Sequence, residues 1–157
     1  MSFEHASMSF VNPLTAMAML DLAKSKKTKA VIVDAAASSL GRMLNRFLPP
    51  EGIEVLNIVR RVEQVELLKK EGATHIINSE EEGFEETLKL QAAKLQATVC
   101  YDAIGGAITG RILKCMPKKS IIYVYGLLSG ESLHGVDVGD LLYGHKTITG
   151  LFLPNWL

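Results

Sequence analysis

The stretch "KAVIVDAAASSLGRML", from Lys29 to Leu44, decides the fold of this chain. Its first part, 29–35, is an apolar run rich in β-branched residues, which predicts a buried strand, and the residues after it have helical spacing. The turn between them consists of small residues and contains no glycine before Gly41. Such a unit can bind a phosphate at the helix N-terminus, or it can be a tight turn without a ligand.

Five more runs of the same kind follow, at 54–60, 75–78, 98–104, 120–126 and 146–153. Segments with helical spacing separate the first five runs, and proline or glycine ends the first, second and fourth of these segments just before the next run. Runs that are apolar without alternation indicate strands covered on both faces. The whole chain, 1–157, is therefore expected to form one three-layer α/β/α domain, a doubly wound, parallel, six-stranded Rossmann sheet.

Two segments outside this repeat are also interpretable. "NPLTAMAMLDLAKS", which precedes the first strand, predicts a helix with Asn12 as its cap and Pro13 at its first position. The glycine-rich run 126–144 predicts mostly loop, with a short helix at 138–143. The triplet 80–82 is interpreted as the solvated edge of a loop.

The composition excludes several classes of function. Seventeen basic and seventeen acidic residues give a net charge of zero, so no long-range field would gather nucleic acid or an anionic membrane. The apolar runs are too short to span a bilayer, and the N-terminus lacks the pattern of a secretion signal, which favours the cytoplasm or the mitochondrial matrix. Cys100 and Cys115 are expected to be buried thiols, and the four scattered histidines predict no metal site.

The turn after the first strand and the end of the second strand together suggest a nucleotide. The hydroxyls of Ser38 and Ser39 can donate to phosphate oxygens while capping the helix, and Gly41 allows close helix packing. Arg60 and Arg61 stand where an NAD site usually has an acidic residue, so a 2′-phosphate, and hence NADPH, is favoured. The alternative is that Arg61 faces water and pairs with a glutamate of the next helix.

Several blocks, in order, resemble the cofactor domain of the medium-chain dehydrogenase/reductases, in the zinc-independent branch of quinone reductases and enoyl thioester reductases. The blocks span essentially the whole chain. They are "FVNPLTAMAML", "AAASSLGRML", "VRR", "EGATHIINSEE", "DAIGG", "YVYG" and "ITGLFLPNWL".

The resemblance implies a set of residues that contact NADPH. The pyrophosphate would lie against Ala37, Ser38, Ser39, Leu40 and Gly41, and the 2′-phosphate against Arg60 and Arg61. The adenosine half would be flanked by Ala103, Ile104 and Gly105, and the nicotinamide end by Thr15, Tyr125, Gly126, Phe152 and Leu153. Alternatives stay open for the last group: Thr15 as an ordinary helix residue, Tyr125 as a packing residue, and Phe152 and Leu153 as strand core.

The resemblance also implies an activity, the transfer of hydride to an activated double bond or a quinone, with an acceptor that the sequence does not name. Members of the family carry an N-terminal catalytic domain, from which 10–25 would be the helix leading in, and the isolated chain is expected to be inactive. A second hypothesis is a degenerate Rossmann domain that serves homodimer formation through its sixth strand. A third hypothesis is a methyltransferase-like fold that binds S-adenosylmethionine. It is disfavoured, because such a fold usually has a glycine-rich first turn and an acidic residue at the end of the second strand, and this sequence has neither.

Overall fold

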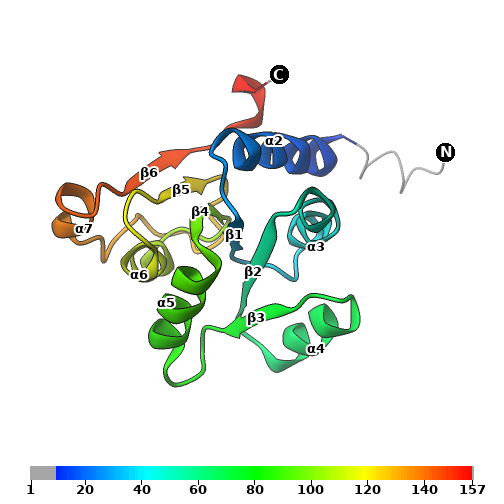
Figure 1. Cartoon of the computed structure of the whole chain (residues 1–157), viewed down its shortest axis with the longest axis horizontal. Coiled ribbons are helices and arrows are strands. Elements are labelled where there is room, and N and C mark those ends of the chain that lie inside the picture. The colour runs from blue at the N-terminus through cyan, green and yellow to red at the C-terminus, as the bar shows by residue number, and fades with distance from the viewer. Residues whose placement is uncertain (1–9, 157) are drawn as a thin grey trace.

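The computed structural model describes residues 10–156, which form a parallel sheet between two layers of helices (Figure 1). The strands are β1 (Ala30–Val33), β2 (Glu54–Val59), β3 (His75–Asn78), β4 (Ala97–Asp102), β5 (Ile121–Val124) and β6 (Thr147–Gly150). The helices are α2 (Val11–Ser25), α3 (Ser39–Phe47), α4 (Val62–Lys70), α5 (Phe84–Leu95), α6 (Ala107–Cys115) and α7 (Val138–Leu142), with short 3₁₀ turns at Pro49–Glu51 and Leu153–Asn155. None of the helices in this described part has the length and apolar character needed to cross a membrane.

The order of the strands in the sheet is β3-β2-β1-β4-β5-β6, and all neighbours are parallel. The predicted doubly wound Rossmann sheet is therefore confirmed. The order reverses at β1, where Val33 is in register with Asn57 of β2 on one side and with Tyr101 of β4 on the other. The carboxyl ends of these three strands consequently meet at one edge, where doubly wound sheets bind ligands.

Each face of the sheet has its own hydrophobic core. Val31 and Val33 of β1 join the core formed with α2, α3 and α4, whereas Ala30 and Ile32 join the core formed with α5 and α6. All four residues of β1 are completely buried. Because successive side chains of a strand point to opposite faces, a strand covered on both sides has to be apolar throughout.

The start of α2 differs from the sequence prediction. The helix begins at Val11, its capping position is Phe10, and no side chain caps it, so the assignment of Asn12 as the cap is wrong. Asn12 and Pro13 lie inside the first turn. Proline is tolerated there because the first N–H groups of a helix have no intrahelical acceptor.

The sixth strand is shorter than predicted. It ends at Gly150, and the chain then enters the 3₁₀ turn that contains Pro154. Phe152 is 66% exposed, so the alternative that Phe152 and Leu153 form strand core is wrong. Proline has no N–H for a ladder hydrogen bond, so the strand cannot continue through Pro154 as an inner strand would. The predicted short helix after the glycine-rich loop is confirmed as α7.

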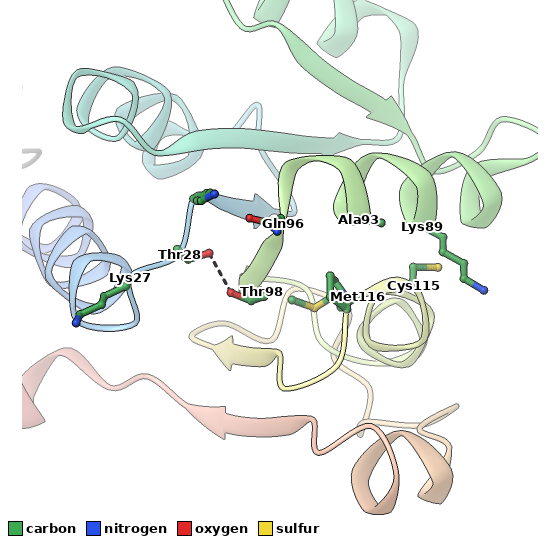
Figure 2. A pocket seen from close by; sticks show the side chains of 10 residues that line it. Lys27, Thr28, Lys89, Ala93, Gln96, Thr98, Cys115 and Met116 are labelled. Atoms are coloured by element: carbon green, nitrogen blue, oxygen red, sulfur yellow. Dashed lines mark hydrogen bonds between the residues drawn. The ribbon is translucent and has the colours of Figure 1, made fainter.

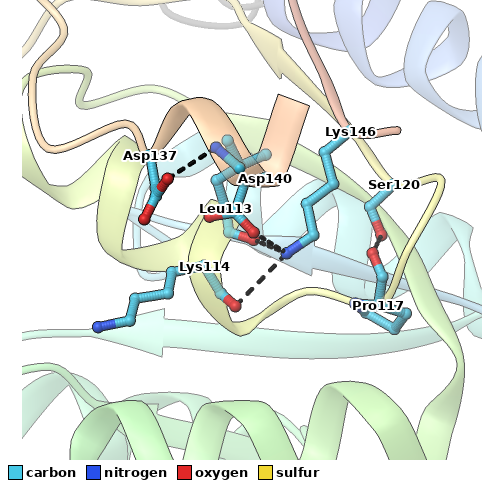
Figure 3. Close-up of polar contacts among 8 residues, drawn as sticks. Leu113, Lys114, Pro117, Ser120, Asp137, Asp140 and Lys146 are labelled. Carbon is cyan, nitrogen blue, oxygen red and sulfur yellow. Dashed lines mark hydrogen bonds and ion pairs between the residues drawn. The ribbon is translucent and has the colours of Figure 1, made fainter. Parts of the chain in front are cut away.

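A buried lysine connects the last elements of the sheet (Figure 3). The Lys146 ammonium donates to the carbonyl of Leu113 at 2.7 Å and pairs with Asp140 Oδ1 at 2.7 Å. Leu113 lies near the end of α6 and Asp140 lies in α7, while Lys146 directly precedes β6. One side chain thus joins two helices to the start of the edge strand.

We expect Lys146→Met to lower the free energy of unfolding by about 2 to 4 kcal/mol, since it leaves a largely buried carboxylate and a helix-end carbonyl without their donor. Lys69→Met is the matched control, because Lys69 pairs with Glu66 on the surface, with side chains 59% and 66% exposed. The control should change stability by less than about 0.5 kcal/mol. Urea unfolding measures both, and equal effects would show that Lys146 is not a structural link.

Candidate functional site

A cavity of about 460 Å³ lies at the carboxyl edge of the sheet, next to the point where the strand order reverses. The turn after β1, the ends of β2 and β3, the start of α4, the first turns of α6 and the loop after β5 all contribute to its walls. The lining residues are Ala35, Ala37, Ser38, Ile58, Val59, Arg60, Gln64, Ser79, Glu80, Ile104, Ala107, Ile108, Arg111, Leu128 and Ser129.

The turn after β1 is held tightly against the start of α3. The Ser38 hydroxyl caps the helix by accepting from the N–H of Gly41 at 3.1 Å, which confirms the predicted cap. Ala35 has a φ of +44°, a left-handed conformation that favours glycine. A Cβ added to Gly41 would collide with the carbonyl of Ala36, so glycine is needed for the helix to approach the turn this closely. The capped start of α3 is thereby placed beside the cavity, which Ser38 lines.

Three arginines lie near this edge, and the structure separates them. Arg60 lines the cavity, is exposed, and forms no ion pair within residues 10–156. Arg61 occupies the capping position of α4 and does not line the cavity. Arg111 does line it, but its guanidinium is 3.0 Å from Glu85 Oε1 and lies over the ring of Phe84. The charge of Arg60 is therefore the one that is available to an anion.

The turns after β4 and β5 are bonded to each other and close the far wall. The N–H groups of Leu128 and Ser129 donate to the carbonyls of Ala103 and Ile104, at 3.1 and 2.9 Å. A Cβ on Gly126 would press against the backbone of Ala103, so glycine permits this close contact. The two loops therefore act as one wall.

Two buried carboxyl groups stand beneath this wall, Asp34 after β1 and Asp102 at the end of β4. Asp34 Oδ1 accepts from the N–H of Ala103 at 2.7 Å, and Asp102 Oδ1 accepts from the N–H groups of Ile104 and Gly105, both at 2.8 Å. Burial, and then the neighbouring Asp102 carboxyl, raise the pKa of Asp34 well above its ordinary value. Burial therefore favours the neutral form of Asp34.

Tyr125 and Thr15 do not reach the cavity. The Tyr125 hydroxyl is buried without a partner in the described part of the chain, and burial raises the pKa of this phenol, which makes it a poorer acid. Thr15 is buried in α2 and its hydroxyl donates to the carbonyl of Val11 at 2.7 Å. These contacts favour the packing interpretations of both residues, and their placement at a nicotinamide stays a prediction.

The structure brings only part of the predicted site together. Ala37, Ser38, Arg60 and Ile104 line the cavity. The other predicted residues lie outside its lining, several of them in turns directly behind it: Thr15, Ser39, Leu40, Gly41, Arg61, Ala103, Gly105, Tyr125, Gly126, Phe152 and Leu153. Their contacts with a cofactor stay predictions.

Sequence reasoning missed several polar residues of the cavity. Gln64 accepts from the backbone N–H of Arg60 at 3.2 Å, Ser79 and Glu80 follow β3, and Ser129 comes from the loop after β5. Glu80 belongs to the triplet interpreted as a solvated loop edge; it is exposed, yet it also borders the cavity. Position was the usable signal for Gln64, Ser79 and Glu80, because each lies just past the carboxyl end of a strand or in the following helical turn.

A second cavity, of about 530 Å³, lies at the opposite edge of the sheet (Figure 2). Thr28 and Thr98, at the starts of β1 and β4, share a hydrogen bond of 3.1 Å in it. Lys27 and Lys89 lie at its rim, and Figure 2 shows both side chains directed away from the centre. Lys27 follows the end of α2, where a cation complements the helix carbonyls, and doubly wound sheets bind ligands at the opposite, carboxyl edge. The carboxyl-edge cavity is therefore the candidate site.

Comparison with known proteins identifies the class. Residues 39–156 match the model of the zinc-binding dehydrogenase family, and the chain belongs to this family. It is 28% identical over 141 residues to quinone oxidoreductase 1 of Escherichia coli, covering 89% of this chain and 43% of that protein. It is 30% identical over 135 residues to an acrylyl-CoA reductase of Ruegeria pomeroyi, covering 86% of this chain and 40% of that protein. The resemblance to the medium-chain dehydrogenase/reductases is confirmed.

Solved structures of quinone reductases have the same fold as this chain. A Mesorhizobium loti protein, described as a candidate NADPH:quinone reductase, superposes with a TM-score of 0.92 at 35% identity, covering 99% of this chain and 45% of that one. Escherichia coli quinone oxidoreductase, solved with NADPH, superposes with a TM-score of 0.83 at 26% identity. The match covers 99% of this chain and 48% of that one. The chain thus spans less than half the length of these relatives.

The name of the family raises the question of zinc. In residues 10–156, no group of three or more His, Cys, Asp and Glu side chains gathers in a way that could hold a metal ion. The donor set in the described part of the chain does not fit a zinc site, and no chemical step is assigned to a metal here.

We expect Gly41→Ala to destabilise the domain by roughly 1 to 3 kcal/mol, because its methyl group would force α3 away from the turn after β1. Gly150→Ala is the control, since an added Cβ there meets nothing within 4 Å. Urea unfolding of both variants measures the difference. A fully stable Gly41→Ala variant would show that the close approach is not required.

Proposed function

We propose that this domain binds NADPH at the carboxyl-edge cavity and orients it for reduction of an activated double bond or a quinone. The observation that carries the proposal is the Arg60 guanidinium, which borders the cavity without an ion-pair partner in residues 10–156, close to the capped start of α3. A planar cation next to a helix N-terminus provides two separate contacts for anions, as a dinucleotide with an extra phosphate requires.

In this proposal the pyrophosphate lies at the start of α3. The Ser38 hydroxyl accepts from the Gly41 N–H and still carries its own proton, which it can donate to a phosphate oxygen. Exposed Ser39 can make a similar contact from the first helical position. The 2′-phosphate binds Arg60, and the apolar side chains of Ile104 and Ile108 flank the adenine.

The cofactor supplies the hydride, and this chain binds and orients it. The names of the relatives, quinone oxidoreductases, acrylyl-CoA reductase and enoyl reductases, support an acceptor of the quinone or enoyl thioester class. Tyr125 is not assigned as the proton donor, because its hydroxyl is enclosed and its pKa is raised. The choice among acceptors is attributed to protein segments beyond those described here.

We expect Arg60→Glu to weaken NADPH binding by roughly 10- to 100-fold and to leave NADH binding nearly unchanged, because only NADPH carries the phosphate that the new carboxylate repels. Arg46→Glu makes the same change of charge at an exposed position in the last turn of α3, outside the cavity lining, and serves as the matched control, with an expected loss of a fewfold at most. Calorimetric titration of both variants with each cofactor is the measurement. Equal losses of NADPH and NADH binding in Arg60→Glu would contradict the assigned role.

We also propose that two copies of the chain pair through β6, which is compatible with cofactor binding. β6 is the last strand in the sheet order and is mostly exposed, so one side of it has no strand neighbour within residues 10–156. Tyr143 of the adjoining segment is 76% exposed and Phe152 is 66% exposed. An unpaired edge with neighbouring apolar side chains favours strand addition from a second copy.

Sedimentation velocity over a range of protein concentrations tests this pairing, with a dimer as the expected species at micromolar concentration. Gly150→Pro should shift the equilibrium toward monomer: the N–H groups of Thr147 and Leu151 face β5, so that of Gly150 faces the open edge. Thr149→Ala, on the same strand, is the control. A wild-type chain that stays monomeric at every concentration would refute pairing through β6.

We further infer a reducing compartment, either the cytoplasm or the mitochondrial matrix. Cys100 and Cys115 are both buried and free. Burial raises the pKa of Cys115 to about 11, and it raises the pKa of Cys100 well above the ordinary value. Both thiols therefore stay protonated and unreactive, as expected for structural cysteines of an intracellular protein.

A further inference from the structure

The carboxyl pair beneath the cavity joins the two strands that flank the reversal of the sheet. Asp34 follows β1 and Asp102 ends β4, and neither side chain is exposed. Between them they accept from three consecutive backbone N–H groups, those of Ala103, Ile104 and Gly105. The Thr109 hydroxyl of α6 donates to the remaining oxygen of Asp102. All three backbone N–H groups of the turn 103–105 are thus bound by these two carboxyl groups.

We propose that Asp34 is a positioning residue for cofactor binding: as a neutral carboxylic acid it donates to Asp102, ties β1 to β4 and fixes the turn 103–105 that forms a wall of the cavity. This inference rests on the proposed NADPH site. It assigns a role to a residue that does not line the cavity itself.

The number of hydrogen-bond donors around each carboxyl group indicates that Asp34, and not Asp102, is the neutral one. Asp102 accepts from two N–H groups and one hydroxyl, which stabilise its ionised form. Asp34 accepts from one N–H, and its Oδ2 is buried without a donor in the described chain. A proton on Oδ2 removes this deficit, because the oxygen then becomes a donor to the neighbouring carboxylate.

The other titratable groups that face Asp34 do not supply a compensating charge. They are Asp102 and Cys100 of β4 and Tyr125 after β5, and each is an acid that would be neutral or negative. Ionised Asp34 would therefore face only repulsion at a buried position. In agreement, its pKa is raised, first by burial and then by Asp102.

The turn 103–105 affects the shape of the cavity in two ways, through one of its own side chains and through its hydrogen bonds to the loop after β5. Ile104 lines the cavity directly. The carbonyls of Ala103 and Ile104 accept from Leu128 and Ser129, which also line it. Movement of the turn would therefore displace both loops of the far wall together.

Two substitutions of Asp34 separate this role from simple packing. In Asp34→Asn, the amide can donate to Asp102 and accept from the Ala103 N–H, as the protonated acid does. We expect this variant to bind NADPH within about twofold of the wild type. Asp34→Ala keeps neither bond and should lose at least about tenfold in affinity. Calorimetric titration with NADPH is the measurement, and Asp21→Asn, on the surface of α2, is the control.

Two measurements without cofactor complete the test. Hydrogen exchange of the Ala103, Ile104 and Gly105 amides should be unchanged in Asp34→Asn and faster in Asp34→Ala. For stability, the folded wild type keeps a proton that its unfolded chain releases above about pH 4. Its unfolding equilibrium constant should therefore rise about tenfold per pH unit relative to that of Asp34→Asn, up to the folded pKa, and the ratio of the two constants should not change with pH below about pH 4.

The outcomes are distinguishable. If folded Asp34→Asn loses NADPH binding, or if its stability follows pH as the wild type does, the neutral-donor role is overturned. If Asp34→Ala binds NADPH and protects the three amides like the wild type, the positioning role is overturned. If the wild type binds no NADPH, the proposed function fails, while amide exchange and the pH dependence of unfolding still decide the role of Asp34.

Discussion

The complete burial of β1 is the constraint on which the rest of this domain depends. Its four residues have no exposed surface, with β2 and β4 bonded on either side and helices over both faces. Because the strand order reverses here, the loops after β1 and β4 leave the sheet toward opposite layers and a crevice opens between them. The cavity with Ser38, Arg60 and Ile104 occupies this place, so the burial of one strand determines where a ligand can bind.

Much of the fold could be predicted from the sequence, because a parallel strand covered on both sides has to be apolar along its whole length. The run 29–35 shows this pattern, and the six predicted runs correspond to the six strands. The ends of elements were less predictable, since they depend on single backbone groups. Phe10, not Asn12, precedes the first helical residue, and β6 stops at Gly150 before a proline turn.

The candidate site was predictable only where one local segment defines it. Ser38 caps the helix that follows its own turn, and Arg60 ends the strand in which it was found, so both follow from short-range pattern. Arg111, Ser129 and the pair of Asp34 and Asp102 depend on which strands become neighbours, and residues 68 positions apart in the sequence are brought together only by the sheet. A carboxyl group buried beside another carboxyl group leaves no periodic signal in the sequence.

The turn after β1 shows how a tight strand-to-helix turn can keep its shape with few glycines. Ala35 adopts the left-handed conformation for which glycine is the usual residue, at a cost on the order of 1 kcal/mol for a residue with a Cβ. The surrounding bonds maintain it: the N–H of Ala36 donates to Ile58 and that of Ser38 donates back to Ala35. Glycine is retained at Gly41, where a side chain would collide with the backbone of the turn. Sterics therefore demand glycine at one position and only favour it at the other, which explains how the sequence departs from the glycine-rich form while the turn keeps its shape.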